Sequence, residues 1–148
     1  MNVTLTLNGE QQAVAVEPVE MLMAVLRRLG LRSVRETCGI GVCGSCTVLV
    51  DGRPVSGCLM LAPLVDGCTV VTAEGLADDP VVAAFADAHA YQCGWCTPGF
   101  VVAVRGLLDE NPAPSEREAK EALAGNLCRC GSYLKILDAV QQAAAVGS

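Results

Sequence analysis

The segment Cys38-Gly39-Ile40-Gly41-Val42-Cys43-Gly44-Ser45-Cys46 decides the fold of this chain, because it places three cysteines in one short, glycine-rich loop. A fourth cysteine, Cys58, follows, so that the full spacing is C-x4-C-x2-C-x11-C. Thiolate sulfur is the ligand that redox-active iron prefers. We therefore predict that one iron–sulfur cluster is held by this first set, Cys38, Cys43, Cys46 and Cys58.

The x4 and x2 gaps are typical of plant-type ferredoxins, in which such a loop wraps round one side of a [2Fe–2S] cluster. A cluster with four thiolate ligands is an anion, and burying it is costly unless hydrogen-bond donors point at the sulfurs. Small residues let the backbone come close enough to donate its N–H groups. We expect such backbone contacts around the first cluster at Gly39, Gly41, Gly44 and Ser45.

A second set of cysteines has the spacing C-x2-C-x31-C-x-C and consists of Cys93, Cys96, Cys128 and Cys130. Cys96 and Cys130 each come just before an expected helix start, where the partial positive charge of a helix N-terminus favours thiolate and an anionic cluster. This spacing is weaker evidence alone, but the two sets together predict a second [2Fe–2S] cluster. Zinc and disulfides are the alternatives, although the x4 gap fits structural zinc poorly and disulfides need an oxidising compartment.

Two further reactive side chains fall outside both sets. We expect Cys68 to be a buried, inert thiol in a strand. His89 is the only histidine. We expect it on a helix, packed or facing solvent, without a proton-transfer role.

Composition limits the partners. The chain has 148 residues and a net charge of -6, which argues against nucleic acid and an anionic membrane as partners. The N-terminal sequence MNVTLTLNGE lacks the basic and apolar regions of an export signal, and no apolar run is long enough to span a membrane. We expect a cytoplasmic location, where grouped cysteines are metal ligands more often than disulfides.

Hydrophobic patterning predicts an α+β fold with two domains. Residues 1–75 should form a plant-type ferredoxin-like (β-grasp) domain, and residues 76–148 an all-α four-helix domain that binds the second cluster. We expect the segment 73–80 to be the linker. Strands are expected at 3–7, 11–16, 47–50 and 68–72, and helices at 21–29, 81–90, 97–110, after Ser115, and at 132–145, with Thr97 as an N-cap and a capping box from Ser115 to Glu118.

Three strings resemble a known family. The run from Cys38 to Val48 (CGIGVCGSCTV), the string from Gln92 to Gly99 (QCGWCTPG) and the string GNLCRC at 125–130 are very similar to the cluster motifs of the molybdenum hydroxylases. That is the family of xanthine dehydrogenase, aldehyde oxidoreductase and carbon monoxide dehydrogenase. The resemblance covers nearly the whole chain, which looks like the separate small iron–sulfur subunit of such an enzyme. One departure is Trp95, where phenylalanine is common in relatives.

The resemblance implies an electron-transfer subunit of a multi-subunit oxidoreductase, with no substrate site on this chain. A large subunit would hold molybdopterin, and electrons would pass through the second cluster, then the first, to an acceptor that is commonly FAD on a medium subunit. Gln92 and Cys130 match residues that approach the pterin in relatives, so we expect them to be molybdopterin contacts. The assembly would be a higher heteromer such as a dimer of heterotrimers. The alternatives are a free-standing ferredoxin-like carrier and a zinc-stabilised interaction module.

Overall fold

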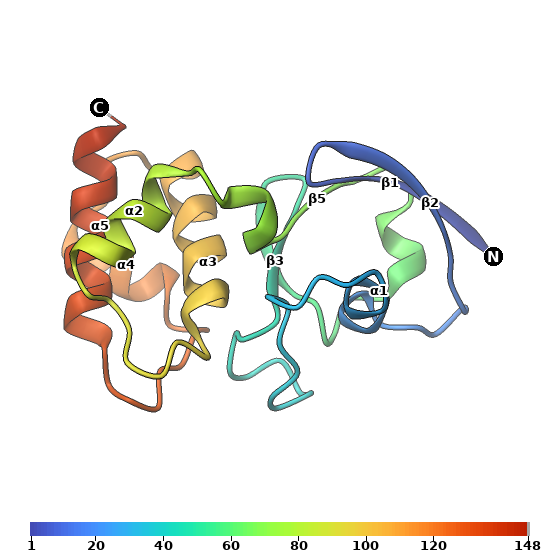
Figure 1. Ribbon diagram of the computed structural model, residues 1–148, viewed down its shortest axis with the longest axis horizontal. Helices are drawn as coiled ribbons and strands as arrows, with labels where there is room; N and C mark the ends of the chain where they lie inside the picture. Colours follow the sequence, from blue (N-terminus) through green and yellow to red (C-terminus); the bar gives the residue numbers. More distant parts are fainter. Residues whose placement is uncertain (148) are drawn as a thin grey trace.

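The chain forms a sheet lobe and a helical lobe that lie side by side, as the computed structural model in Figure 1 shows for residues 1–147. The N-terminus lies at the outer end of the sheet lobe and the C-terminal helix at the outer side of the helical lobe (Figure 1). The predicted α+β class with two units is therefore confirmed. No helix among residues 1–147 is long and apolar enough to cross a membrane.

The sheet lobe contains one mixed sheet and one packed helix. Its strands are β1 (Asn2–Leu7), β2 (Glu10–Ala15), β3 (Thr47–Val50), β4 (Arg53–Ser56) and β5 (Thr69–Val71), in the spatial order β2-β1-β5-β3-β4. β1 and β5 run parallel, and the other neighbours run antiparallel. Leu22, Val25 and Leu26 of helix α1 (Leu22–Arg28) belong to the same buried core as Val3 and Leu5 of β1. This arrangement is the predicted ferredoxin-like domain.

Both hairpins of the sheet lobe turn where the sequence predicts. Asn8 and Gly9 have φ of 49° and 88°, and Asp51 and Gly52 have φ of 48° and 79°. Two-residue turns with positive φ at both positions match the twist of the strands, and Asn-Gly and Asp-Gly adopt them most readily.

The helical lobe contains the four predicted helices. They are α2 (Pro80–Asp87), α3 (Thr97–Glu110), α4 (Glu116–Ala122) and α5 (Tyr133–Val146). Ser115 and Glu118 form the predicted capping box at α4. Two details differ from the prediction. Cys96, and not Thr97, is the N-cap of α3, because Thr97 is already helical. His89 lies beyond α2 with φ of 50°, since the helix ends at a left-handed residue there.

Strand β3 joins the two lobes. Successive side chains of a strand point to opposite faces, so Val48 packs into the sheet-lobe core while Leu49 packs into the helical-lobe core. Gly106 of α3 lies over Leu49, and a Cβ atom there would come within 2.9 Å of the leucine side chain. The two lobes therefore share a tightly packed boundary.

The predicted linker is more structured than its sequence indicates. It begins with a short 3-10 helix, η2 (Ala73–Leu76), and Leu76 is buried in the helical-lobe core. The Glu74 carboxylate accepts hydrogen bonds from the Ser33 backbone N–H at 2.9 Å and from the Thr72 hydroxyl at 2.6 Å. The linker is therefore held on the sheet lobe at one end and in the helical core at the other. A second 3-10 helix, η1 (Ala62–Val65), precedes β5.

Candidate iron–sulfur centres

The first set of cysteines converges at one end of the sheet. Cys38 and Cys43 lie in the loop between α1 and β3, Cys46 lies just before β3, and Cys58 lies just after β4. The four thiols form two pairs. Cys38 lies within hydrogen-bonding reach of Cys43, and the Cys58 backbone N–H donates to the Cys46 sulfur at 3.4 Å.

Backbone N–H groups face Cys38, a member of the outer pair of this set. The Ile40 N–H donates to the Cys38 sulfur at 3.5 Å, and the N–H groups of Cys43 and Val42 also face it. These donors lower the pKa of the Cys38 thiol to about 6. Burial, in contrast, raises the pKa of the inner Cys46 thiol to about 11.

The glycines predicted around the first centre adopt a left-handed backbone, but the N–H groups that face the Cys38 sulfur belong to other residues. The predicted residues Gly39, Gly41 and Gly44 have φ of 67°, 74° and 72°, which is the left-handed region that favours glycine. Two of the three N–H groups that face the Cys38 sulfur belong to residues that follow these glycines, Ile40 and Val42. The buried Ser45 accepts a hydrogen bond from the Arg35 backbone N–H at its carbonyl, at 3.1 Å.

The second set is assembled from two loops of the helical lobe. Cys93 and Cys96 lie between α2 and α3, while Cys128 and Cys130 lie between α4 and α5. The thiols again pair across the loops, Cys93 with Cys130 and Cys96 with Cys128. The Gln92 side-chain amide donates to the Cys130 carbonyl at 3.1 Å and ties the two loops together.

In the second set, the pKa values of the exposed Cys93 and the half-buried Cys96 differ in the same direction as those of Cys38 and Cys46, but the buried Cys128 departs from this order. The Trp95 N–H donates to the exposed Cys93 sulfur at 3.5 Å and lowers the pKa of that thiol. Burial, followed by the neighbouring Cys128, raises the pKa of the Cys96 thiol to about 12. Burial also raises the pKa of Cys128, but donors from Ser132 outweigh it and the net shift is downward. The Ser132 N–H lies 3.4 Å from the Cys128 sulfur, at the start of α5.

The donor set fits a binuclear iron cluster. Within residues 1–147, no three His, Cys, Asp or Glu side chains are grouped so that one metal ion could bind them all. Structural zinc needs four ligands around one point, whereas a [2Fe–2S] cluster takes one pair of thiolates at each of its two irons. Each set supplies two pairs, with backbone N–H groups facing the sulfurs. A cluster held there would accept and release one electron at a time.

The two sets lie next to each other at the edge where the lobes meet. The loops that carry them are found together along the lower side of Figure 1. The Leu127 N–H donates to the Cys43 carbonyl at 2.9 Å, which links a neighbour of the second set directly to a member of the first. A cavity of about 320 Å³ has cysteines of both sets in its wall, namely Cys43, Cys93, Cys96 and Cys128.

Buried contacts fix this proximity. The Asn126 side chain donates to the Gly44 carbonyl at 3.1 Å and to the Thr47 hydroxyl at 3.2 Å. A Cβ atom at Gly99, near the start of α3, would lie only 2.3 Å from the same Gly44 carbonyl oxygen. Backbone therefore contacts backbone between the first-set loop and α3.

An exposed bridge joins the same loops on another side. The Arg35 guanidinium lies 4.8 Å from the Trp95 ring centroid and donates to the carbonyls of Gly94 and Trp95 at 2.6 Å and 2.7 Å. The Trp95 indole N–H donates to the Thr37 hydroxyl at 2.8 Å. Sequence reasoning missed Arg35, Thr37 and Asn126, because their partners are 58 to 82 residues away along the chain. In the sequence, only their positions close to cysteines indicated that these residues could contribute to the site.

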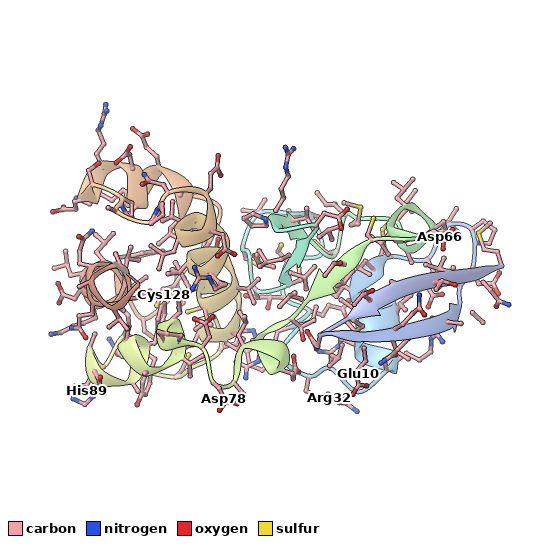
Figure 2. All side chains as sticks on the ribbon, turned by 90° about the horizontal axis from the view of Figure 1, so that it is seen from above. Glu10, Arg32, Asp66, Asp78, His89 and Cys128 are labelled. Carbon is pink, nitrogen blue, oxygen red and sulfur yellow. The ribbon has the colours of Figure 1, made fainter. Side chains whose placement is uncertain are left out.

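The two reactive side chains outside the sets lie apart from them. Cys68 is half-buried just before β5, and not buried inside the strand as predicted, because its side chain packs at the sheet end near Asp66. Burial, followed by the neighbouring Asp51, raises the pKa of its thiol, which favours an unreactive state. Figure 2 shows His89 at the outer edge of the helical lobe and pointing away from it, whereas Cys128 lies inside the lobe beside α3.

Comparison with known proteins finds two family models that match this chain. Residues 5–75 match the family described as "2Fe-2S iron-sulfur cluster binding domain", and residues 72–141 match "[2Fe-2S] binding domain". The nicotinate dehydrogenase small FeS subunit of Eubacterium barkeri is 45% identical over 97% of this chain and 94% of its own length. The xanthine dehydrogenase iron-sulfur-binding subunit of Escherichia coli O157:H7 is 39% identical over 95% of this chain and 92% of its own length.

This chain belongs to the small iron–sulfur subunits of the molybdenum hydroxylase family. The predicted family is thereby confirmed. Members of this family carry electrons inside heteromeric oxidoreductases, and the chain is such an electron-transfer subunit.

Solved structures of family members have the same fold. In quinoline 2-oxidoreductase from Pseudomonas putida 86, a chain with 42% identity superposes with a TM-score of 0.93 over 99% of this chain and 94% of that one. The aldehyde oxidoreductase of Desulfovibrio gigas has 38% identity and a TM-score of 0.95, but the matched region is only 17% of its longer chain. The same two-lobed unit is therefore a separate subunit in one relative and part of a long chain in another.

Proposed function

We propose that this chain relays electrons between two partner subunits of a molybdenum hydroxylase. In this proposal, Cys93, Cys96, Cys128 and Cys130 hold the cluster that receives electrons from molybdopterin on the large subunit. The first set, Cys38, Cys43, Cys46 and Cys58, holds the cluster that passes them to an acceptor, FAD on a medium subunit. The contact of Leu127 with Cys43 carries the proposal, because it puts ligand-bearing loops of the two sets in direct hydrogen-bonded contact.

Each set has exposed residues at its edge, which supports separate points of entry and exit for electrons. Gln92 and Cys93 are exposed at the second set, and the Gln92 amide already lies on the Cys130 backbone. We propose Gln92 and Cys130 as molybdopterin contacts. At the first set, the apolar side chains of Ile40 and Val42 are 67% and 53% exposed beside the cysteines. Apolar side chains at this exposure favour a covering partner, which we take to be the acceptor subunit.

The proposal extends to the organisation of the assembly. We take 1–75 and 76–148 as the two cluster-binding domains; residue 148 itself lies outside the described residues. We expect the large and medium subunits to associate with this chain as a heterotrimer that dimerises, in the cytoplasm. Neither nucleic acid nor a membrane is expected as a partner.

Native purification tests this proposal. A tag on this chain should recover two further subunits, and the purified material should contain molybdopterin, flavin and iron. Elution of this chain alone with both clusters would support a free-standing carrier instead. Colourless, iron-free, zinc-containing protein would support the interaction module and contradict the proposal. Recovery of a cytochrome without flavin would overturn the assignment of FAD as acceptor.

A further inference from the structure

Two buried hydroxyl groups next to the second set have no hydrogen-bond partner among residues 1–147. They are the side-chain oxygens of Thr97 and Ser132. Thr97 directly follows Cys96 at the start of α3, and Ser132 is the N-cap of α5, two residues after Cys130. A buried hydroxyl without a partner costs stability, and most buried polar groups in folded proteins have one.

Ser132 differs from the other serine at a helix start. Ser115 has the extended backbone of an ordinary N-cap (φ -65°, ψ 161°), and its hydroxyl accepts from the Glu118 N–H. Ser132 has φ -74° and ψ 15°, and its side chain makes no capping hydrogen bond. An N-cap side chain reaches the N2 or N3 amide from the extended conformation. The backbone of Ser132 therefore directs its hydroxyl to something other than its own helix.

The nearest identified acceptor for Ser132 is a sulfur. Its backbone N–H donates to the Cys128 sulfur at 3.4 Å, and its hydroxyl acts on the same thiol. Both residues are buried, with exposed fractions of 6% and 7%. The hydroxyl itself has no hydrogen-bond partner among residues 1–147. Because hydroxyl groups rotate, a sulfur that gains negative charge on binding iron would orient the O–H toward itself.

We propose that Ser132, and Thr97 from the other helix, are positioning residues whose hydroxyls donate hydrogen bonds to sulfur atoms of the second centre. Such donors stabilise the more negative, reduced state more than the oxidised state and so raise the reduction potential. Reduction adds one electron, and each hydroxyl keeps its proton. This inference rests on the proposed ligand set of the second centre. It goes beyond that proposal because it assigns to two side chains the control of that centre's potential.

A redox titration of the native complex, monitored by electron paramagnetic resonance, tests the inference. The second-centre signal is the one that Cys96→Ser removes. In Ser132→Ala, the equilibrium constant for its reduction should fall about tenfold, which is a downward shift of about 59 mV for one electron. Thr97→Val, which keeps the shape of the side chain, should shift the same potential downward. Ser132→Thr keeps the hydroxyl and should restore most of the wild-type value.

Two controls separate this effect from a general loss of structure. Ser115→Ala removes a hydroxyl at another helix start and should leave both potentials unchanged. The first-centre potential should not change in any of these variants. An unchanged second-centre potential in both Ser132→Ala and Thr97→Val would overturn the inference.

A measurement on the wild-type complex keeps the inference testable if Ser132→Ala loses the centre. Hydroxyl protons exchange with solvent much faster than buried amide protons. Electron–nuclear double resonance of the reduced second centre, after brief transfer to deuterated water, should therefore show a rapidly exchanged coupling. Its absence would overturn the inference. If the wild-type complex had no second-centre signal at all, the proposed function would fail first, and this inference with it.

Discussion

Each of the two cysteine sets brings four thiols and nearby N–H groups together, but the local structure that does so differs between them. The first set lies in one loop and one hairpin, and its sulfurs are faced by backbone N–H groups that glycines hold in place. The second set needs two loops that are far apart in sequence but meet at one side of the helical lobe, and its sulfurs lie beside the N-terminal ends of α3 and α5. The first depends on local turns, whereas the second depends on the packing of helices far apart in sequence. The second should therefore be lost more easily when the helical lobe is disturbed.

Substitution of a single ligand should have the largest effect, because it removes the signal of one centre and keeps that of the other. Cys46→Ser should remove the first electron paramagnetic resonance signal of the reduced complex, because that buried thiol is paired with Cys58 and has no substitute. Cys96→Ser should remove the second signal and leave the first. Cys68→Ser is the matched control, since Cys68 belongs to neither set, and it should keep both signals. Two intact signals in either ligand variant would contradict the ligand assignment.

Thiol reactivity should show a gradient from Cys38 and Cys93, whose pKa values are lowered, to Cys96, whose pKa is raised. In metal-free chain that retains its native circular dichroism, iodoacetamide alkylation should follow the thiolate fraction, which rises with pH. Cys38 should reach half of its maximal rate near pH 6, and Cys96 should stay unlabelled until the pH approaches 12. Cys93 should react before Cys96, because its pKa is lowered. Peptide mass spectrometry measures each site; equal rates for Cys38 and Cys96 at pH 7 would contradict the gradient.

Substitution at the contact between the lobes should destabilise the chain moderately. In Gly99→Ala, the added methyl group would meet the Gly44 carbonyl at 2.3 Å, so backbone must move. Overpacking of this kind costs about 1–3 kcal/mol, which chemical denaturation can measure. Gly125→Ala is the control, because a Cβ atom there has nothing within 4 Å. Equal stability of the two variants would show that the lobes do not meet at Gly99.

The exposed bridge between Trp95 and Thr37 should contribute least to the stability of the chain. Trp95→Phe keeps a ring for Arg35 to stack on but removes the indole N–H donor to Thr37. Both residues are exposed, so we expect a loss of about 0.5 kcal/mol, at the low end for a hydrogen bond. A double-mutant cycle with Thr37→Val isolates the interaction. Fully additive effects of the two substitutions would exclude an energetic contribution from this bond.

Local signals in the sequence predicted most of the fold. The Asn8-Gly9 and Asp51-Gly52 turns and the Ser115 capping box are set by neighbouring residues, and the structure confirms them. The corrected details depend on tertiary contacts. Thr97 loses its predicted N-cap role because Cys96 already occupies that position beside the second set. The linker gains a 3-10 helix because Glu74 has partners at Ser33, on a distant loop.

The grouping of the cysteines was predictable, but the contact between their loops was not. Cysteine spacing reports ligand geometry, so each set could be recognised separately. The contacts of Asn126 with Gly44 and of Trp95 with Thr37 join segments that are 82 and 58 residues apart. No periodicity or spacing encodes such pairs. The proximity of the two sets, on which electron transfer depends, therefore required the structure.

Spin quantification of the fully reduced complex by low-temperature electron paramagnetic resonance tests the central claim most directly. If the eight cysteines hold two adjacent [2Fe–2S] clusters, double integration should give about two unpaired spins for each copy of this chain, one per cluster. The two signals should also be split by their mutual magnetic interaction. A single unsplit signal that integrates to about one spin, with full iron content, would contradict two separate neighbouring centres.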